Sequence, residues 1–253
     1  GLRSLGDALI PDMFARKGLK IHFILSHVHW DHIQGLPFFG PLYVSKEKGI
    51  FNRWHFLGGT DWQKTAEVCL KGQMDPPTFP VSWKEIEKAT GEIVCDDMWD
   101  GKSMSLGDAS VKFGKLNHPQ ETYGSRMIFP GGRVVVYATD HEPYDPLYPD
   151  PRLLALSRDA DVFITDCQYT KGQYEGSKEE GGVPRHGWGH SYPEAIAQIA
   201  IQANVKTVVL FHHDPKSSDE KIKIMEQYTQ ELINVRGGKS KVIAAWEGLE
   251  IQL

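Results

Sequence analysis

The feature that most constrains the fold is a buried strand that runs directly into a cluster of metal-ligand side chains. Residues 19–25 read LKIHFIL, a nearly continuous apolar run with β-branched residues, which predicts a strand buried in a sheet. The residues that follow read SHVHWDH, so four potential ligands stand close together: His27, His29, Asp31 and His32. A solvated loop has no reason to concentrate ligands directly after a buried strand. We therefore predict a metal site at the end of this strand.

The residue types and their spacing in this segment favour more than one metal ion. Imidazole nitrogens and carboxylate oxygens suit zinc and other borderline divalent ions. In an extended segment, side chains two residues apart point the same way, so His27 and His29 can reach one ion. Asp31 and His32 come after a turn and can face a second ion close by.

Two ions need more ligands than this segment holds. Further candidates lie directly after predicted strands: His118, Asp140 and His212. Any one of these alone would more often be a cap or a surface residue, but strand ends are where a rigid sheet displays functional side chains. A carboxylate such as Asp140 can also bridge two cations.

The remaining pattern predicts a layered α/β arrangement with helices outside two sheets. Further strands are predicted at 42–45, 110–116, 126–129, 133–138, 161–165, 206–211 and 242–246. Helices are predicted at 2–9, 152–157 and 219–235, and another begins at Ser191 as N-cap with Pro193 in its first turn.

Residues 51–105 differ from the rest because they are rich in Gly, Pro and Trp and have weak periodicity. We expect a loop-rich insertion at about 51–105 within a single domain, 1–253. The proline density of 73–80 excludes a regular element there. The insertion carries aromatic residues that we expect to be exposed: Trp54, Trp62, Phe79 and Trp83. Exposed aromatics of this density often mark an interface, so we expect a homodimer.

Composition excludes several classes of protein. With 40% hydrophobic and 24% charged residues, the chain is not disordered, and its apolar runs are strand-sized, so we expect no membrane span. The net charge of -5 argues against binding to duplex nucleic acid, but not against a small anionic substrate held by metal. The three cysteines form no CxxC pair, which fits a reducing compartment, and we expect a cytoplasmic protein.

The sequence resembles the metallo-β-lactamase superfamily over nearly its whole length. The resemblance rests on SHVHWDH at 26–32, NHP at 117–119, ATD at 138–140 and LFHHD at 210–214. It implies an α/β fold, an αββα sandwich with a dinuclear metal site at one edge. The family usually has N-terminal strands with an Asp-x-Gly-x-Gly turn before its first helix, and we expect those strands to be missing from this chain.

Within the superfamily, the sequence looks most like the branch that holds tRNase Z and related phosphodiesterases. The residues that carry this are GLP at 35–37, DVFITDCQYT at 161–170, GHS at 189–191 and LFHHDP at 210–215. The second of these resembles the strand that places an acidic residue, here Asp166, near the site. The third resembles the element that supplies a histidine, here His190, which binds no metal.

Carried over residue by residue, the resemblance implies seven ligands for two ions. One ion would be held by His27, His29 and His118. The other would be held by Asp31, His32 and His212, and Asp140 would bridge them. The expected ions are Zn²⁺, with Mn²⁺ or Fe as possible replacements.

The same resemblance implies three catalytic residues. His190 would protonate the leaving-group oxygen, with Asp166 fixing its orientation, and Asp31 would accept or orient a proton of the nucleophile.

We therefore expect a dinuclear metal-dependent hydrolase that cleaves a phosphodiester. A small substrate such as a cyclic nucleotide fits the acidic net charge and the lack of the Gly/Pro-rich basic arm that long-form tRNase Z enzymes use to bind tRNA. Three alternatives stay open at this point. They are a tRNA 3′-end processing endonuclease, a thioester or lactam hydrolase of the same superfamily, and a non-catalytic scaffold or sensor.

Overall fold

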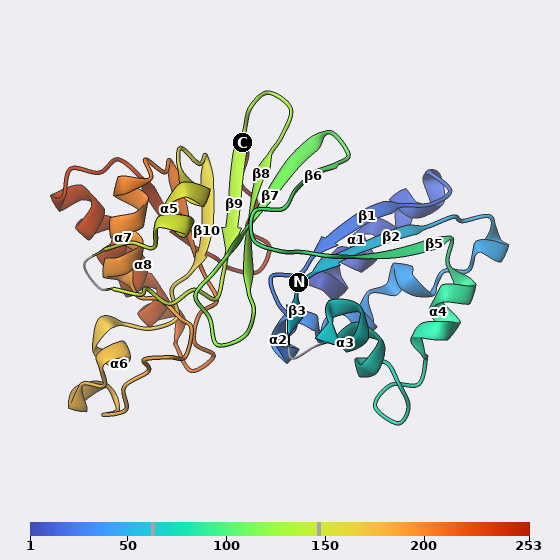
Figure 1. Cartoon of the computed structure of the whole chain (residues 1–253), viewed down its shortest axis with the longest axis horizontal. Helices are drawn as coiled ribbons and strands as arrows, with labels where there is room; N and C mark the ends of the chain where they lie inside the picture. Colours follow the sequence, from blue (N-terminus) through green and yellow to red (C-terminus); the bar gives the residue numbers. More distant parts are fainter. Residues whose placement is uncertain (62–63, 146–147) are drawn as a thin grey trace. The chain divides into compact units, whose positions relative to one another are not determined.

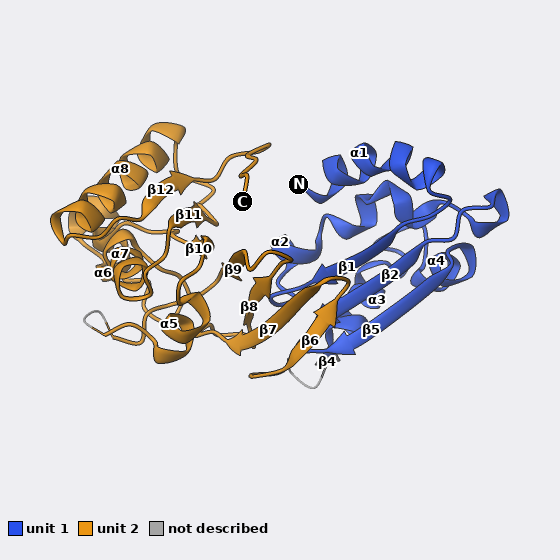
Figure 2. Ribbon diagram, turned by 90° about the horizontal axis from the view of Figure 1, so that it is seen from above, with its two compact units in different colours: residues 1–98 blue, residues 99–253 orange. Residues whose placement is uncertain are grey.

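Two main sheets, each with its own helices and core, make up the chain (Figure 1). The computed structural model describes residues 1–61, 64–145 and 148–253. The chain divides into two units, residues 1–98 and 99–253, which Figure 2 draws in different colours. Among the described residues, no helix has the length and apolar character needed to cross a bilayer.

The first unit is built on a parallel sheet in the order β1 (Lys20–Ile24), β2 (Arg53–Gly58) and β5 (Glu92–Asp97). Its other elements are α1 (Leu2–Ala15), α2 (Trp30–Ile33), α3 (Ala66–Gln73) and α4 (Trp83–Ala89), the pair β3 (Thr60–Asp61) and β4 (Lys64–Thr65), and the 3-10 helices η1 (Leu36–Phe38), η2 (Gly40–Tyr43) and η3 (Lys46–Lys48). Side chains alternate across the sheet, so Phe23, Trp54 and Phe56 share its core face.

The second unit is built on a seven-stranded sheet in the order β12-β11-β10-β9-β8-β7-β6. Its strands are β6 (Ser103–Leu106), β7 (Ala109–Lys115), β8 (Tyr123–Ile128), β9 (Val134–Ala138), β10 (Val162–Asp166), β11 (Thr207–Phe211) and β12 (Lys241–Ala244). Strands β9 to β12 pair in parallel, whereas β6 to β9 pair antiparallel. The carboxyl ends of β9, β10 and β11 therefore meet at one edge, where open α/β sheets display their functional groups.

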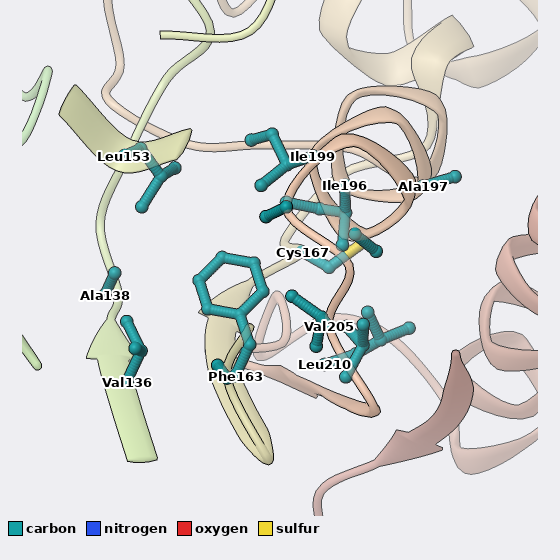
Figure 3. Packing of buried hydrophobic residues seen from close by; sticks show 14 of the residues in the cluster. Val136, Ala138, Leu153, Phe163, Cys167, Ile196, Ala197, Ile199, Val205 and Leu210 are labelled. Atoms are coloured by element: carbon teal, nitrogen blue, oxygen red, sulfur yellow. The ribbon is translucent and has the colours of Figure 1, made fainter. Parts of the chain in front are cut away.

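Helices cover one face of this sheet and close the main core of the second unit. They are α5 (Pro151–Ser157), α7 (Pro193–Gln202) and α8 (Asp219–Val235), while α6 (Lys171–Glu175) and η4 (Lys178–Glu180) lie in the connection before α7. In Figure 3, Val136 and Phe163 of the sheet point toward Leu153 of α5 and Ile196 of α7. This packing holds the strand ends rigidly, since the side chains of a close-packed interior have little room to move.

Most of the predicted elements are present, including the strand at 19–25 and the helix at 219–235. The strand predicted at 42–45 is wrong, because Gly40–Tyr43 forms a 3-10 helix with Pro41 in its first turn. Proline favours a helical φ and has no N–H to donate to a sheet. The helix predicted from Ser191 begins one residue later, with Tyr192 as N-cap and Pro193 as its first residue.

Residues 51–105 hold regular elements rather than a run of loops: β2, α3, α4, β5 and β6. Trp54 and Trp83 are buried, with 1% and 2% of their surfaces exposed, and Phe79 packs against the same core. Trp62 lies outside the described residues. The expectation that these aromatics form an interface is therefore wrong for Trp54 and Trp83. The strands and helices around them are too short to show a hydrophobic period in the sequence, although their apolar residues form a core. The homodimer and the single domain stay predictions.

Replacing Trp54 with Ala tests how much the core of the first unit contributes to the free energy of unfolding. We expect W54A to lower the free energy of unfolding by about 3–5 kcal/mol, the cost of a large cavity in a packed interior. The matched control is F14A on α1, where half of the side chain is exposed, and it should cost less than about 1 kcal/mol. Urea unfolding followed by circular dichroism measures both. Equal losses for the two variants would contradict the assigned core.

Candidate functional site

In the first unit, the four ligand-type residues that follow β1 lie against one another. His27 Nε2 lies 2.8 Å from His29 Nδ1, and the rings of His27 and His32 have centroids 4.2 Å apart. His32 Nε2 lies 3.4 Å from a carboxylate oxygen of Asp31. The side chain of His27 is buried, and Ser26 Oγ lies 3.1 Å from its Nδ1. The segment thus presents three imidazoles and one carboxylate in a small space, which is the donor set that zinc-like ions prefer.

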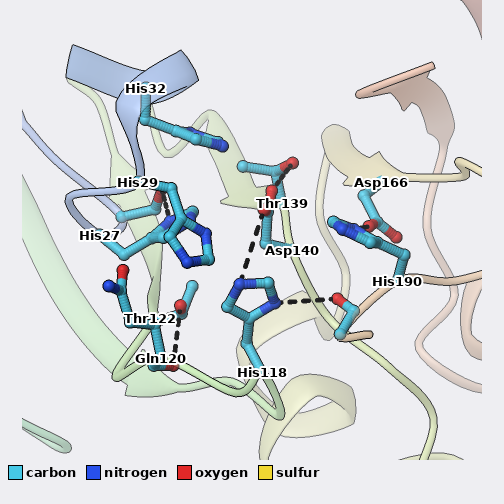
Figure 4. Close-up of polar contacts among 12 residues, drawn as sticks. His27, His29, His32, His118, Gln120, Thr122, Thr139, Asp140, Asp166 and His190 are labelled. Atoms are coloured by element: carbon cyan, nitrogen blue, oxygen red, sulfur yellow. Dashed lines mark hydrogen bonds and ion pairs between the residues drawn. The ribbon is translucent and has the colours of Figure 1, made fainter. Parts of the chain in front are cut away.

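In the second unit, Asp140 stands between two histidines. Its Oδ2 lies 4.0 Å from His118 Nε2 (Figure 4). Its Oδ1 lies 3.6 Å from His212 Nε2. Thr139 Oγ1 donates to Asp140 Oδ1 at 2.8 Å, which steadies the carboxylate. Each oxygen of one buried carboxylate therefore faces a different imidazole. This is the arrangement required of a carboxylate that bridges two cations.

The backbone at these strand ends adopts a conformation that non-glycine residues rarely take. Asp140 follows β9 with φ of 64°, and His212 follows β11 with φ of 55°. Left-handed backbone costs free energy for residues with a Cβ atom, so it persists where surrounding contacts impose it. Such outliers cluster at functional sites, and here both belong to residues singled out from the sequence.

Hydrogen bonds at the histidines fit metal ligation. His118 Nδ1 lies 3.2 Å from the Gly189 carbonyl oxygen, so Nδ1 carries the hydrogen and Nε2 keeps its lone pair on the side of Asp140. Gln168 Nε2 lies 3.4 Å from His212 Nδ1, while Gln168 Oε1 is buried without a hydrogen-bond partner among the described residues. A half-turn of that amide would let Oε1 accept from Nδ1 and leave His212 Nε2 as the ligand atom.

A histidine–carboxylate pair lies beside these residues. His190 Nδ1 lies 2.6 Å from Asp166 Oδ2, and the Ser191 N–H donates to Asp166 Oδ1 at 2.8 Å. Asp166 is fully buried at the end of β10, and burial raises the pKa of its carboxyl while the hydrogen bond with His190 acts in the opposite direction. The rings of His190 and His212 stack with centroids 5.0 Å apart. A buried carboxylate thus fixes both the tautomer and the orientation of the His190 ring.

The loop that carries His190 is held by a residue that sequence reasoning missed. Glu142 Oε1 accepts from Tyr174 Oη at 2.7 Å and from the Gly187 N–H at 2.8 Å, and its Oε2 accepts from the Gly189 N–H at 2.8 Å. Gly189 has φ of 86°, and a Cβ there would collide with the His118 ring, so only glycine fits. The side chain of Glu142 therefore locks the loop against His118.

The structure brings the sequence-derived candidates together within each unit. The first unit gathers His27, His29, Asp31 and His32. The second gathers His118 with Asp140, Asp166, His190 and His212, and the last four each offer a ligand atom within 4.8 Å of the others. Glu142 lies two residues after Asp140, and that proximity was the only hint of its role in the sequence. Nothing in the sequence around Gln168 indicates that its side chain lies beside His212.

Removing the Glu142 carboxylate should loosen the loop. We expect E142A to lower the free energy of unfolding by about 3 kcal/mol, because it leaves buried donors without an acceptor. E142Q should cost less. Its Oε1 still accepts from Tyr174 and Gly187, and only the hydrogen bond from the Gly189 N–H is lost, because an amide NH₂ group takes the place of Oε2. Urea unfolding measures the loss, with E231A on the exposed face of α8 as control. An E142A variant as stable as E231A would show that the loop does not depend on this carboxylate.

The chain is similar to proteins of a known family. A family model described as a β-lactamase superfamily domain matches residues 18–213. The uncharacterized protein ML1173 of Mycobacterium leprae is 26% identical over 216 residues, which are 80% of this chain and 63% of that protein. The chain thus spans less than two thirds of the length of the curated relatives that it matches first. Ribonuclease Z of Lactiplantibacillus plantarum is 23% identical over 94% of this chain and 82% of that protein.

Solved structures share the fold at low sequence identity. Yeast PDE1 superposes with a TM-score of 0.63 at 13% identity, covering 90% of this chain and 67% of that one. The short form of human tRNase Z superposes with a TM-score of 0.57 at 16% identity, covering 91% and 78%. Because the family model spans most of the sequence and these structures share its fold, the chain belongs to the metallo-β-lactamase superfamily and has relatives similar to tRNase Z.

Proposed function

We propose that this chain is a dinuclear metal-dependent phosphodiesterase that acts on a small substrate. The observation that carries the proposal is the His190–Asp166 pair, in which an imidazole held by a buried carboxylate lies beside Asp140 and His212. A protein that only bound metal would need no such oriented imidazole. The superfamily consists mostly of metal-dependent hydrolases, which supports an enzyme rather than a scaffold.

We further propose that the ligand sets of the two units serve one pair of ions. One ion would be held by His27, His29 and His118, and the other by Asp31, His32 and His212, with Asp140 between them. The donor set of imidazoles and carboxylates fits Zn²⁺, and Mn²⁺ or Fe would also fit, because mixed sites of this kind select weakly among divalent metals. When bound, such ions supply Lewis acidity and offset the charge of the phosphate oxygens.

His190 has the role of general acid in this proposal. Asp166 accepts the hydrogen of Nδ1, so Nε2 is the atom that holds and delivers a proton to the departing oxygen. An alkoxide leaving group needs this proton because it is far more basic than water at neutral pH. Asp31, whose side chain is more than half exposed, would accept or orient a proton of the attacking water.

The substrate class rests on charge and on relatives. The net charge of -5 favours a small anionic substrate over a nucleic-acid duplex. Yeast PDE1 and the short form of human tRNase Z share the fold alone, so a small diester and tRNA both stay candidate substrates. The similarity to Ribonuclease Z favours a tRNA 3′-end endonuclease as the second candidate. A panel of cyclic nucleotides, precursor tRNA, a lactam and a thioester, assayed with Zn²⁺ and Mn²⁺, separates these activities.

The location and assembly belong to the same proposal. All three cysteines are free of disulfides, which supports a reducing, cytoplasmic location. We retain a homodimer as the expected assembly, and a monomer in light scattering at working concentration would refute it.

Metal content tests the ligand assignment. Elemental analysis of protein prepared without chelators should find two ions per chain, because seven ligands are more than one ion can use. H212A should lower the content and bind metal more weakly, since it removes a ligand of one ion. Finding a single ion in the wild type, with no change in H212A, would exclude the dinuclear site.

The general acid can be separated from the metal ligands by the leaving group. H190A should keep both ions yet lose about a hundredfold or more in rate on an alkyl diester. Its loss should be smaller on bis(p-nitrophenyl) phosphate, whose phenolate needs little protonation. D166N should resemble H190A more weakly, because it removes the orienting charge but not the acid.

The control for this series is D140A. It should lose metal and all activity together, whatever the leaving group, because it removes the proposed bridge. If H190A strips a metal, or slows both substrates equally, His190 is a ligand or a substrate-binding residue instead.

A further inference from the structure

A cavity of about 410 Å³ opens in the second unit beside His118. Its lining includes Asn117, His118, Tyr144, Tyr174 and His186. This volume lies within the range of pockets that bind small molecules. His118 is also a proposed metal ligand, so the cavity and the proposed metal site share this residue.

Aromatic rings form the walls of the cavity. The Tyr174 and His186 rings have centroids 4.3 Å apart, and the Tyr174 hydroxyl donates to Glu142, which fixes the ring in place. Tyr144 also lines the cavity, and 61% of its surface is exposed. One ring is thus held rigidly while two others are accessible to a ligand. Flat faces of this kind bind other flat rings by stacking.

The lining of the cavity also includes the amide of Asn117. Asn117 Nδ2 donates to the Glu142 carbonyl oxygen at 2.9 Å, which fixes the orientation of the amide. Its Oδ1 is then the atom that can accept a hydrogen bond from an N–H of a ligand. A flat ligand with N–H groups at its edge would stack on the aromatic rings and donate a hydrogen bond to Asn117 Oδ1.

We propose that this cavity binds the nucleobase of the substrate, so that the substrate is a nucleotide phosphodiester. The proposal rests on the proposed function, since it places the base beside the phosphate through the shared residue His118. A nucleobase supplies a π-face for Tyr144 and His186 and an N–H edge for Asn117. Tyr144 then favours substrates that carry a base over base-free ones, and it takes no part in bond cleavage.

The activity test compares 3′,5′-cyclic AMP with the methyl riboside 3,5-cyclic phosphate, in which a methoxy group replaces the base. Y144A should raise KM for cyclic AMP about tenfold and leave KM for the base-free substrate unchanged, as expected for the loss of one stacking partner. Y144F should behave as the wild type. The matched control is Y228A on α8, an exposed tyrosine outside the cavity lining, which should change neither substrate.

A binding test keeps this proposal independent of catalysis. In saturation-transfer NMR with EDTA present, AMP should give a signal from its base protons, ribose 5-phosphate should give none, and Y144A should weaken the AMP signal. Failure of the wild type to cleave any diester, with AMP still bound through Tyr144, would overturn the proposed function alone. Equal effects of Y144A on both cyclic substrates, or an AMP signal that Y144A does not change, would overturn the nucleobase pocket.

Discussion

The parallel pairing of β9, β10 and β11 is the constraint on which the rest of the second unit depends. The register sets Ala138 beside Thr165 and Asp166 beside Phe211, so the chain leaves all three strands at the same edge. Asp140, Asp166 and His212 therefore converge without any need for proximity in the sequence. A slip of one residue would turn the side chain of Asp166 to the opposite face of the sheet. The hydrophobic core behind these strands prevents that slip, because Phe163 on β10 would leave its packed position.

At this edge of the sheet, two carboxylates, Asp140 and Asp166, lie close to the imidazoles of His190 and His212. Positive charge is needed there to offset the two carboxylates. Asp140 and Asp166 are both buried, and the charge of Asp140 adds to the burial that raises the pKa of Asp166. Buried charges are costly unless they are paired or coordinate metal, so the proposed cations would offset the charge of Asp140, while His190 pairs with Asp166. Both oxygens of Glu142 accept hydrogen bonds from backbone N–H groups of the loop that carries His190. Its role is to position that loop rather than to bind an ion.

The sequence predicts the elements whose patterns are long or chemically distinctive, and it fails where they are short. The apolar run at 19–25, the helix at 219–235 and the histidines after the first strand were predictable because period, length and ligand chemistry agree. The sequence indicates a surface position for Trp54 and Trp83, because the elements around them are too brief to show a period, yet both residues are buried. Glu142 and Gln168 act through contacts with residues distant in sequence, and no local pattern encodes those contacts.

We have proposed that ligands from both units hold one pair of metal ions while His190 holds a proton. Anomalous diffraction at the zinc edge, from crystals of protein loaded with Zn²⁺, tests it most directly. We expect two peaks about 3.5–4 Å apart, the usual separation of the ions in two-metal sites. Asp140 should lie between the peaks, and His190 should be hydrogen-bonded to Asp166 outside the coordination sphere. A single peak, two distant peaks held by separate units, or a peak coordinated by His190 would contradict the account.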